Sequence, residues 1–102
     1  MTFKEWLKYA VKNRSTDIRQ LLPELKLKDG TELSVQASEF HMCYPKEKLD
    51  DGEYLRVEVY THGEKIEGLY GMYEPSSYTY GHVPIDFMEE LCELHGGILM
   101  EE

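Results

Sequence analysis

Apolar residues recur at helical intervals at the start of the chain, and this pattern predicts an amphipathic first helix. Its apolar positions are Phe3, Trp6, Leu7, Ala10 and Val11. Thr2 and Glu5 have the spacing of a capping box, so the helix should begin next to Thr2. Ser15 or Thr16 could cap a second short helix, with Ile18, Leu21 and Leu22 inside it and Pro23 at its end.

From Glu24 the apolar period changes to two, which is typical of strands. Residues 25–28 and 33–37 alternate between apolar and polar, and the pair Asp29-Gly30 lies between them. An Asp-Gly pair in this position is a strong hairpin signal. We expect the second strand to continue to Tyr44, with a bulge near Ser38–Glu39 where the apolar parity shifts.

Residues 53–61 alternate again and predict a third strand, and a fourth is expected through Ile66, Leu69 and Tyr70. Residues 71–82 are rich in Gly, Ser, Tyr and Pro and predict a loop. Pro84 suits the first turn of a last helix, and Gly96 suits its end. The predicted fold is therefore one α+β domain over residues 1–102. It has N-terminal helices, a four-stranded, mainly antiparallel sheet, and a C-terminal helix packed on one face.

Charge is segregated along the chain. Residues 1–28 hold seven of the eleven Lys and Arg residues and three acids, whereas residues 29–102 hold seventeen acids and four bases. The net charge of −9 gives most of the molecule a negative field, which argues against direct nucleic-acid binding and favours basic protein surfaces. The composition shows no membrane span, no secretory signal and no disulfide scaffold, so we expect a cytoplasmic protein with reduced thiols.

Two constellations could carry chemistry. His41-x-Cys43 and Cys92-x-x-His95 together supply a zinc ligand set if strand and helix meet, although the usual paired-cysteine half-site is missing. The alternative is that both cysteines pack as small buried residues. A cysteine nucleophile is disfavoured because acidic surroundings raise a thiol pKa. We find no nucleotide-binding glycine pattern and expect neither an enzyme nor a cofactor.

Tyrosines interleave with carboxylates between residues 53 and 80. Tyrosine is enriched in protein interfaces, and carboxylates bind guanidinium groups, so such a patch would suit an Arg-rich surface. An equally weighted alternative is that half of these tyrosines pack across strands. The predicted partner-binding residues are Glu53, Glu58, Glu67, Tyr70, Tyr73 and Glu74.

Three segments carry a resemblance: residues 34–45 (SVQASEFHMCYP), residues 54–59 (YLRVEV) and residues 81–98, from Gly81-His82-Val83-Pro84-Ile85 to His95-Gly96-Gly97-Ile98. Over about residues 31–98 the chain resembles small acidic proteins of phages and conjugative elements of Gram-positive bacteria. Among these it is most similar to the type II-A anti-CRISPR proteins that inhibit Cas9. The resemblance implies non-enzymatic inhibition in the host bacterial cytosol, by occupying a basic channel of Cas9 or blocking its loading with guide RNA.

Two other functions stay open. One is a mobile-element accessory domain that binds a partner from its own operon, and the other is the zinc or thiol domain described above. We expect a monomer, although an exposed edge strand could pair two copies.

Overall fold

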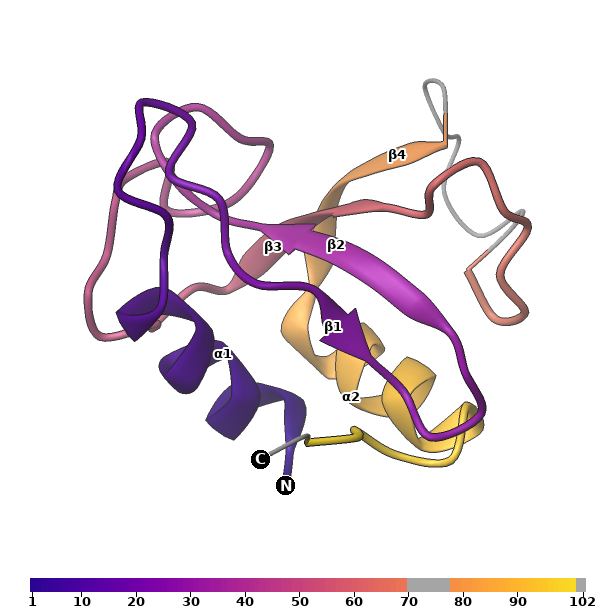
Figure 1. Cartoon of the computed structure of the whole chain (residues 1–102). Helices are drawn as coiled ribbons and strands as arrows, with labels where there is room; N and C mark the ends of the chain where they lie inside the picture. Colours follow the sequence, from indigo (N-terminus) through magenta and orange to yellow (C-terminus); the bar gives the residue numbers. More distant parts are fainter. Residues whose placement is uncertain (70–77, 101–102) are drawn as a thin grey trace.

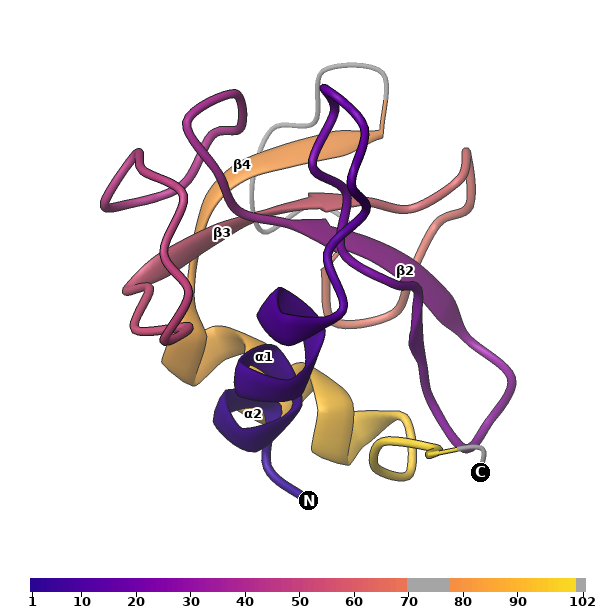
Figure 2. The same ribbon diagram turned by 60° about the vertical axis from the view of Figure 1, so that its left-hand side comes forward.

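The structure, a computed structural model, describes residues 1–69 and 78–100 and has the predicted α+β class. Its elements are α1 (Phe3–Lys12), β1 (Leu25–Lys26), β2 (Glu32–Gln36), β3 (Arg56–Tyr60), β4 (Thr79–Pro84) and α2 (Ile85–Leu94). The strands form one antiparallel sheet in the order β1-β2-β3-β4. Both helices lie on the same face of this sheet (Figure 1, Figure 2).

Helix α1 begins as the sequence predicts. Thr2 accepts a hydrogen bond from the Glu5 backbone N–H, and the Glu5 side chain accepts one from the Thr2 N–H at 2.8 Å. This capping box satisfies two N–H groups that a helix end leaves without partners. All five predicted apolar residues of the helix are buried, so the amphipathic assignment is confirmed.

The predicted hairpin is also confirmed. Leu25 pairs with Leu33, and Lys26 pairs with Glu32. Gly30 has a φ of 96°, a conformation that glycine adopts without steric cost, and its N–H donates to the Leu27 carbonyl. After helix α2 the chain returns to this hairpin, where Ile98 bridges Leu27.

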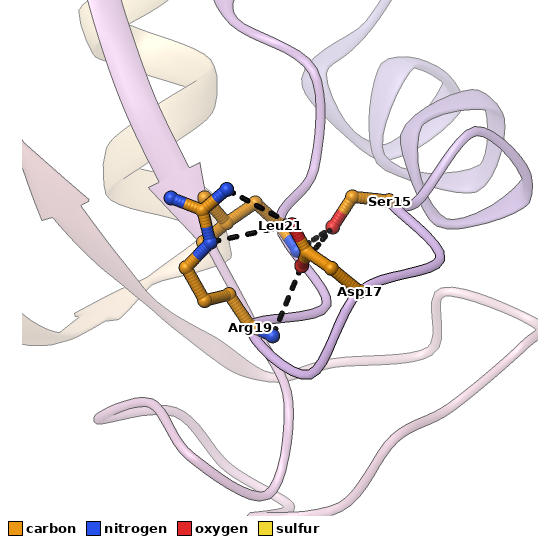
Figure 3. A network of polar contacts seen from close by, with 4 residues as sticks. All are labelled: Ser15, Asp17, Arg19 and Leu21. Carbon is orange, nitrogen blue, oxygen red and sulfur yellow. Dashed lines mark hydrogen bonds and ion pairs between the residues drawn. The ribbon is translucent and has the colours of Figure 1, made fainter.

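The predicted second short helix does not form. Residues 13–24 are irregular, and Ile18 is 84% exposed instead of packing on a helix face. A local polar network takes its place, as Figure 3 shows: the Asp17 carboxylate accepts from the Ser15 hydroxyl, the Arg19 backbone N–H and the Arg19 guanidinium. Short polar side chains that bond nearby backbone groups favour such turns over helix. The apolar spacing therefore predicted a second helix that does not form.

Strand β2 ends at Gln36, so the prediction that it reaches Tyr44 is wrong. Where the strand was expected to continue, Ser38 stabilises a turn. Its hydroxyl accepts a hydrogen bond from the Phe40 N–H at 3.0 Å and bonds His41 Nδ1 at 2.6 Å. The chain returns to the sheet at Tyr44, which bridges Arg56. Residues 37–43 therefore form an excursion from the sheet, a larger departure than the predicted bulge.

The fourth strand lies elsewhere than predicted. Residues 61–69 form turns in which Ile66 and Leu69 are buried without a strand, and Tyr70 lies outside the described residues. The strand is β4, inside the segment predicted as a loop, and it pairs with β3 from Arg56↔Pro84 to Tyr60↔Thr79. A register shift next to Gly81 and His82 breaks the apolar alternation of β4, which explains why the period-two signal was weak.

Helix α2 is where the sequence predicts it, with Pro84 as its N-cap residue. Gly96 and Gly97 end it: the Gly97 N–H donates to the Cys92 carbonyl at 2.8 Å, and the Gly96 N–H donates to the Glu93 carbonyl at 3.1 Å. These two bonds form a Schellman motif, and both glycines have positive φ. The motif turns the chain back along β1 and leaves His95 at the helix end.

Candidate protein-binding surface

A cleft with a volume of about 600 Å³ lies at one end of the sheet. The β1–β2 turn forms one wall, the 61–69 turn forms the other, and His95 at the end of α2 forms the floor. Its carboxylates come from Asp29, Glu32, Glu64 and Glu67. We call this feature the acidic cleft.

His95 joins the two walls of the acidic cleft. Its Nδ1 lies 2.6 Å from Asp29 Oδ2 and 3.2 Å from the Thr31 hydroxyl, and its Nε2 lies 2.8 Å from the Glu67 backbone carbonyl. The His95 side chain is only 8% exposed. A backbone carbonyl and a carboxylate both accept hydrogen bonds, so this arrangement suits an imidazole that carries a proton on each nitrogen.

The electrostatics agree with that protonation state. Burial disfavours the charged ring, but the Glu67 carbonyl and the Asp29 carboxylate outweigh burial and raise the pKa of His95. The Thr31 N–H and hydroxyl, together with His95, lower the pKa of Asp29 to about 2. Asp29 is therefore negative and His95 has a raised pKa, which makes their contact a charge-assisted hydrogen bond.

The other three carboxylates of the acidic cleft point toward solvent. Glu32, Glu64 and Glu67 are exposed residues. Two other carboxylates contact basic side chains: Glu53 lies beside Lys8, and Glu24 bonds His62, which itself lines the cleft. The cleft thus offers several carboxylate oxygens to an incoming cation.

The outer face of the sheet, away from the helices, adjoins the acidic cleft. Alternation along a strand places Glu32, Ser34 and Gln36 of β2 on one side. Tyr60 of β3 pairs with Ser34 and makes an edge-to-face contact with the ring of His62, which lines the cleft. The cleft and this face together therefore form one surface with carboxylates and an exposed tyrosine.

The predicted partner-binding residues lie in different parts of the molecule. Glu67 is in the acidic cleft. Glu58 is on the outer face of β3, where it accepts from the Met42 N–H at 3.3 Å. Glu53 lies beside α1, with its carboxylate 3.6 Å from Lys8 Nζ. The remaining three, Tyr70, Tyr73 and Glu74, lie outside the described residues.

The tyrosines divide between the two alternatives that the sequence left open. Tyr60 and Tyr78 are 41% and 37% exposed, whereas Tyr54 and Tyr80 are buried in the core. Both buried tyrosines belong to the hydrophobic core, so only part of the predicted tyrosine patch can reach a partner.

The structure does not bring together the four residues of the zinc or thiol alternative. In residues 1–69 and 78–100, no three His, Cys, Asp or Glu side chains lie close enough to hold a metal ion. His41 bonds Ser38, Cys43 Sγ lies 3.1 Å from the Ser38 carbonyl, and His95 is held by Asp29. Burial raises the pKa of the Cys43 thiol and raises that of Cys92 to about 12, which disfavours the nucleophilic thiolate form of both.

The sequence did not reveal the acidic cleft as a unit. Asp29 and His95 are 66 positions apart, and only the return of the chain at Gly96-Gly97 brings them together. The Asp-Gly turn and the Gly-Gly helix end were each visible in the sequence, but their contact depends on the tertiary fold. No sequence feature distinguishes Glu32 and Glu64 from the many other acids of the chain.

Comparisons with protein-family models, with curated proteins and with solved structures find no match to this chain. Within the described residues, no helix has the length and apolar character that crossing a membrane requires.

Proposed function

We propose that this chain is a non-enzymatic inhibitor that binds the basic, nucleic-acid-binding surface of a protein. The observation that carries the proposal is the acidic cleft, where Glu32, Glu64 and Glu67 present exposed carboxylates next to Tyr60 on the outer sheet face. Carboxylates bind guanidinium groups through charge-assisted hydrogen bonds, and tyrosine adds contact area at low entropic cost. A surface of this kind complements one that is rich in arginine.

Cas9 is the partner that we propose, on the strength of the resemblance to type II-A anti-CRISPR proteins. Cas9 holds its RNA–DNA heteroduplex in a positively charged channel and reads its PAM with arginine side chains. A folded domain with a net charge of −9 can compete for the same cations as the nucleic acid does. The proposed contact includes Glu58 and Glu67, with Glu53, Tyr70, Tyr73 and Glu74 as further predicted contacts.

The test is a Cas9 cleavage assay in which the protein is added before or after guide RNA, with direct binding measured at two salt concentrations. Inhibition on early addition only, with binding that weakens as salt rises, would support competition for the RNA-binding groove. Inhibition at either stage would move the contact to a DNA-facing surface. If several Cas9 orthologues are neither bound nor inhibited, the proposal fails and an accessory interaction domain is the better description.

A further inference from the structure

We propose that His95 is a pH-dependent clasp that fixes the wall of the acidic cleft carrying Glu64 and Glu67, and releases that wall when the imidazole loses a proton. This inference concerns regulation of the surface described above, and its role in partner binding rests on the proposed function. The clasp itself is a property of the protein alone.

The geometry determines which contact breaks. Nε2 faces the Glu67 backbone carbonyl at 2.8 Å, and Nδ1 faces the Asp29 carboxylate at 2.6 Å. Both acceptors are satisfied only when both ring nitrogens carry a proton. A neutral ring keeps one proton, and the carboxylate is the stronger acceptor of the two, so the proton stays on Nδ1. The lone pair of Nε2 then faces the Glu67 carbonyl, and that bond is lost.

The two walls are tied to helix α2 in different ways. On the β1–β2 side, backbone bonds remain whatever the state of the ring: the Asp29 N–H donates to the His95 carbonyl at 3.2 Å, and the Lys28 N–H donates to the Gly97 carbonyl at 2.9 Å. On the other side, the Nε2 bond ties residues 61–69 to the end of α2, alongside apolar packing of Leu69. Deprotonation should therefore loosen the 61–69 turn and spare the hairpin.

Charged groups around His95 act in both directions. The acids that favour the imidazolium are Asp29, Glu32, Glu64 and Glu67 from the two walls and Glu93 on its own helix. The bases that oppose it are His62 and Lys65 in the 61–69 turn, and Lys28, which packs against Gly96. The acids outnumber the bases and include Asp29, whose carboxylate bonds the ring directly, in agreement with a raised pKa for His95.

The test is a pH titration of the isolated full-length protein by NMR, from pH 5.5 to 9. Long-range ¹H–¹⁵N spectra report the protonation state and tautomer of each histidine ring. We expect His95 to titrate above the ordinary histidine pKa of about 6.5 and, once neutral, to be the Nδ1–H tautomer. Amide exchange at Glu64 and Leu69, corrected for its intrinsic pH dependence, should accelerate through the same midpoint by roughly tenfold, as expected when one bond to a charged group is lost. Exchange in β3 should change little.

Two variants sharpen the result. Asp29→Asn should lower the midpoint of His95, whereas His82→Asn, at a residue whose φ of 55° asparagine tolerates, should leave it unchanged. A His95 midpoint at or below about 6.5, an Nε2–H tautomer, or unchanged exchange at Glu64 and Leu69 would overturn the clasp. Cas9 binding at several pH values then separates the two proposals. Weaker binding above the His95 midpoint supports the regulatory role, and binding that is independent of pH overturns it. A titrating clasp with no Cas9 binding at any pH preserves the clasp and removes the proposed function.

Discussion

The substitution Tyr54→Phe should destabilise the protein far more than the loss of one surface hydroxyl. Tyr54 is 2% exposed, and its hydroxyl is shared by several loops: it donates to the Glu47 carbonyl at 2.6 Å and accepts from the Leu49 N–H at 2.8 Å. The Arg14 guanidinium lies 3.3 Å from the same oxygen and also donates to the Ala37 and Leu49 carbonyls. This hydroxyl therefore holds the excursion at 37–43 and the loop at 46–53 against residue 14.

The magnitude follows from the groups that lose a partner. Phenylalanine keeps the ring packing but leaves the Glu47 carbonyl and the Leu49 N–H unpaired at a part-buried position. Each unsatisfied buried group costs about 1–3 kcal/mol, and partial burial places the sum at roughly 2–3 kcal/mol. For a domain of this size, Tm should then fall by about 10 °C.

The assay is thermal and urea unfolding followed by circular dichroism, with Tyr60→Phe as the matched control. Tyr60 is 41% exposed, so its variant should stay within roughly 0.5 kcal/mol of the wild type. A Tyr54→Phe protein as stable as this control would refute the argument, because the hydrogen bonds of the Tyr54 hydroxyl would then contribute nothing measurable to stability.

Four other perturbations test separate parts of the structure. In Gly81→Ala, the new Cβ would lie 2.8 Å from Met42 Sδ and 3.0 Å from Met42 Cβ, so urea unfolding should show a loss of about 1 kcal/mol; Met42→Ala in the same chain should recover part of it. The pKa of Asp29 is lowered to about 2, so it adds stability above the unfolded pKa near 3.8 that is lost as pH falls toward 2; the advantage of the wild type over Asp29→Asn in urea unfolding should shrink over that range. The pKa of His95 is raised, so its contribution is fully present below about pH 6.5 and is lost as pH rises through its folded pKa. Zinc or a chelator should leave Tm unchanged, because no three His, Cys, Asp or Glu side chains of the described residues lie close enough to hold a metal ion; a stabilising shift with one equivalent of zinc would contradict that expectation.

The elements with a local signal were predictable from the sequence. The capping box at Thr2, the Asp29-Gly30 hairpin and the end of α2 at Gly96 all depend on residues close together in the chain. Each is a case in which backbone hydrogen bonds are satisfied within a few residues.

The wrong predictions arose where apolar residues lie outside regular structure, whether buried or exposed. Ile66 and Leu69 suggested a strand because both are apolar, yet they reach the core from turns. Ile18 suggested a helix but is exposed beside the network around Asp17. Burial pattern and secondary structure are separate properties, and single-sequence periodicity cannot distinguish them at such short lengths.

The surface was harder to predict than the fold. The acidic character of the surface followed from charge alone, but seventeen acids after residue 28 gave no means of choosing predicted contacts among them. Glu67 was chosen from the sequence and lies in the acidic cleft, whereas Glu53 lies beside Lys8. The cleft itself depends on the contact of His95 with Asp29 and Glu67, which no local pattern encodes.

The most direct test of the proposed contact is the dissociation constant for Cas9 of two variants that lose the same charge. One carries Glu32→Gln, Glu64→Gln and Glu67→Gln in the acidic cleft. The other neutralises exposed acids elsewhere, with Glu47→Gln, Asp50→Asn and Glu90→Gln. If the cleft is the contact, the first variant should bind at least tenfold more weakly than the second, which is about 1.4 kcal/mol. Equal affinities would show that charge alone, and not the acidic cleft, determines binding, and would contradict the central claim.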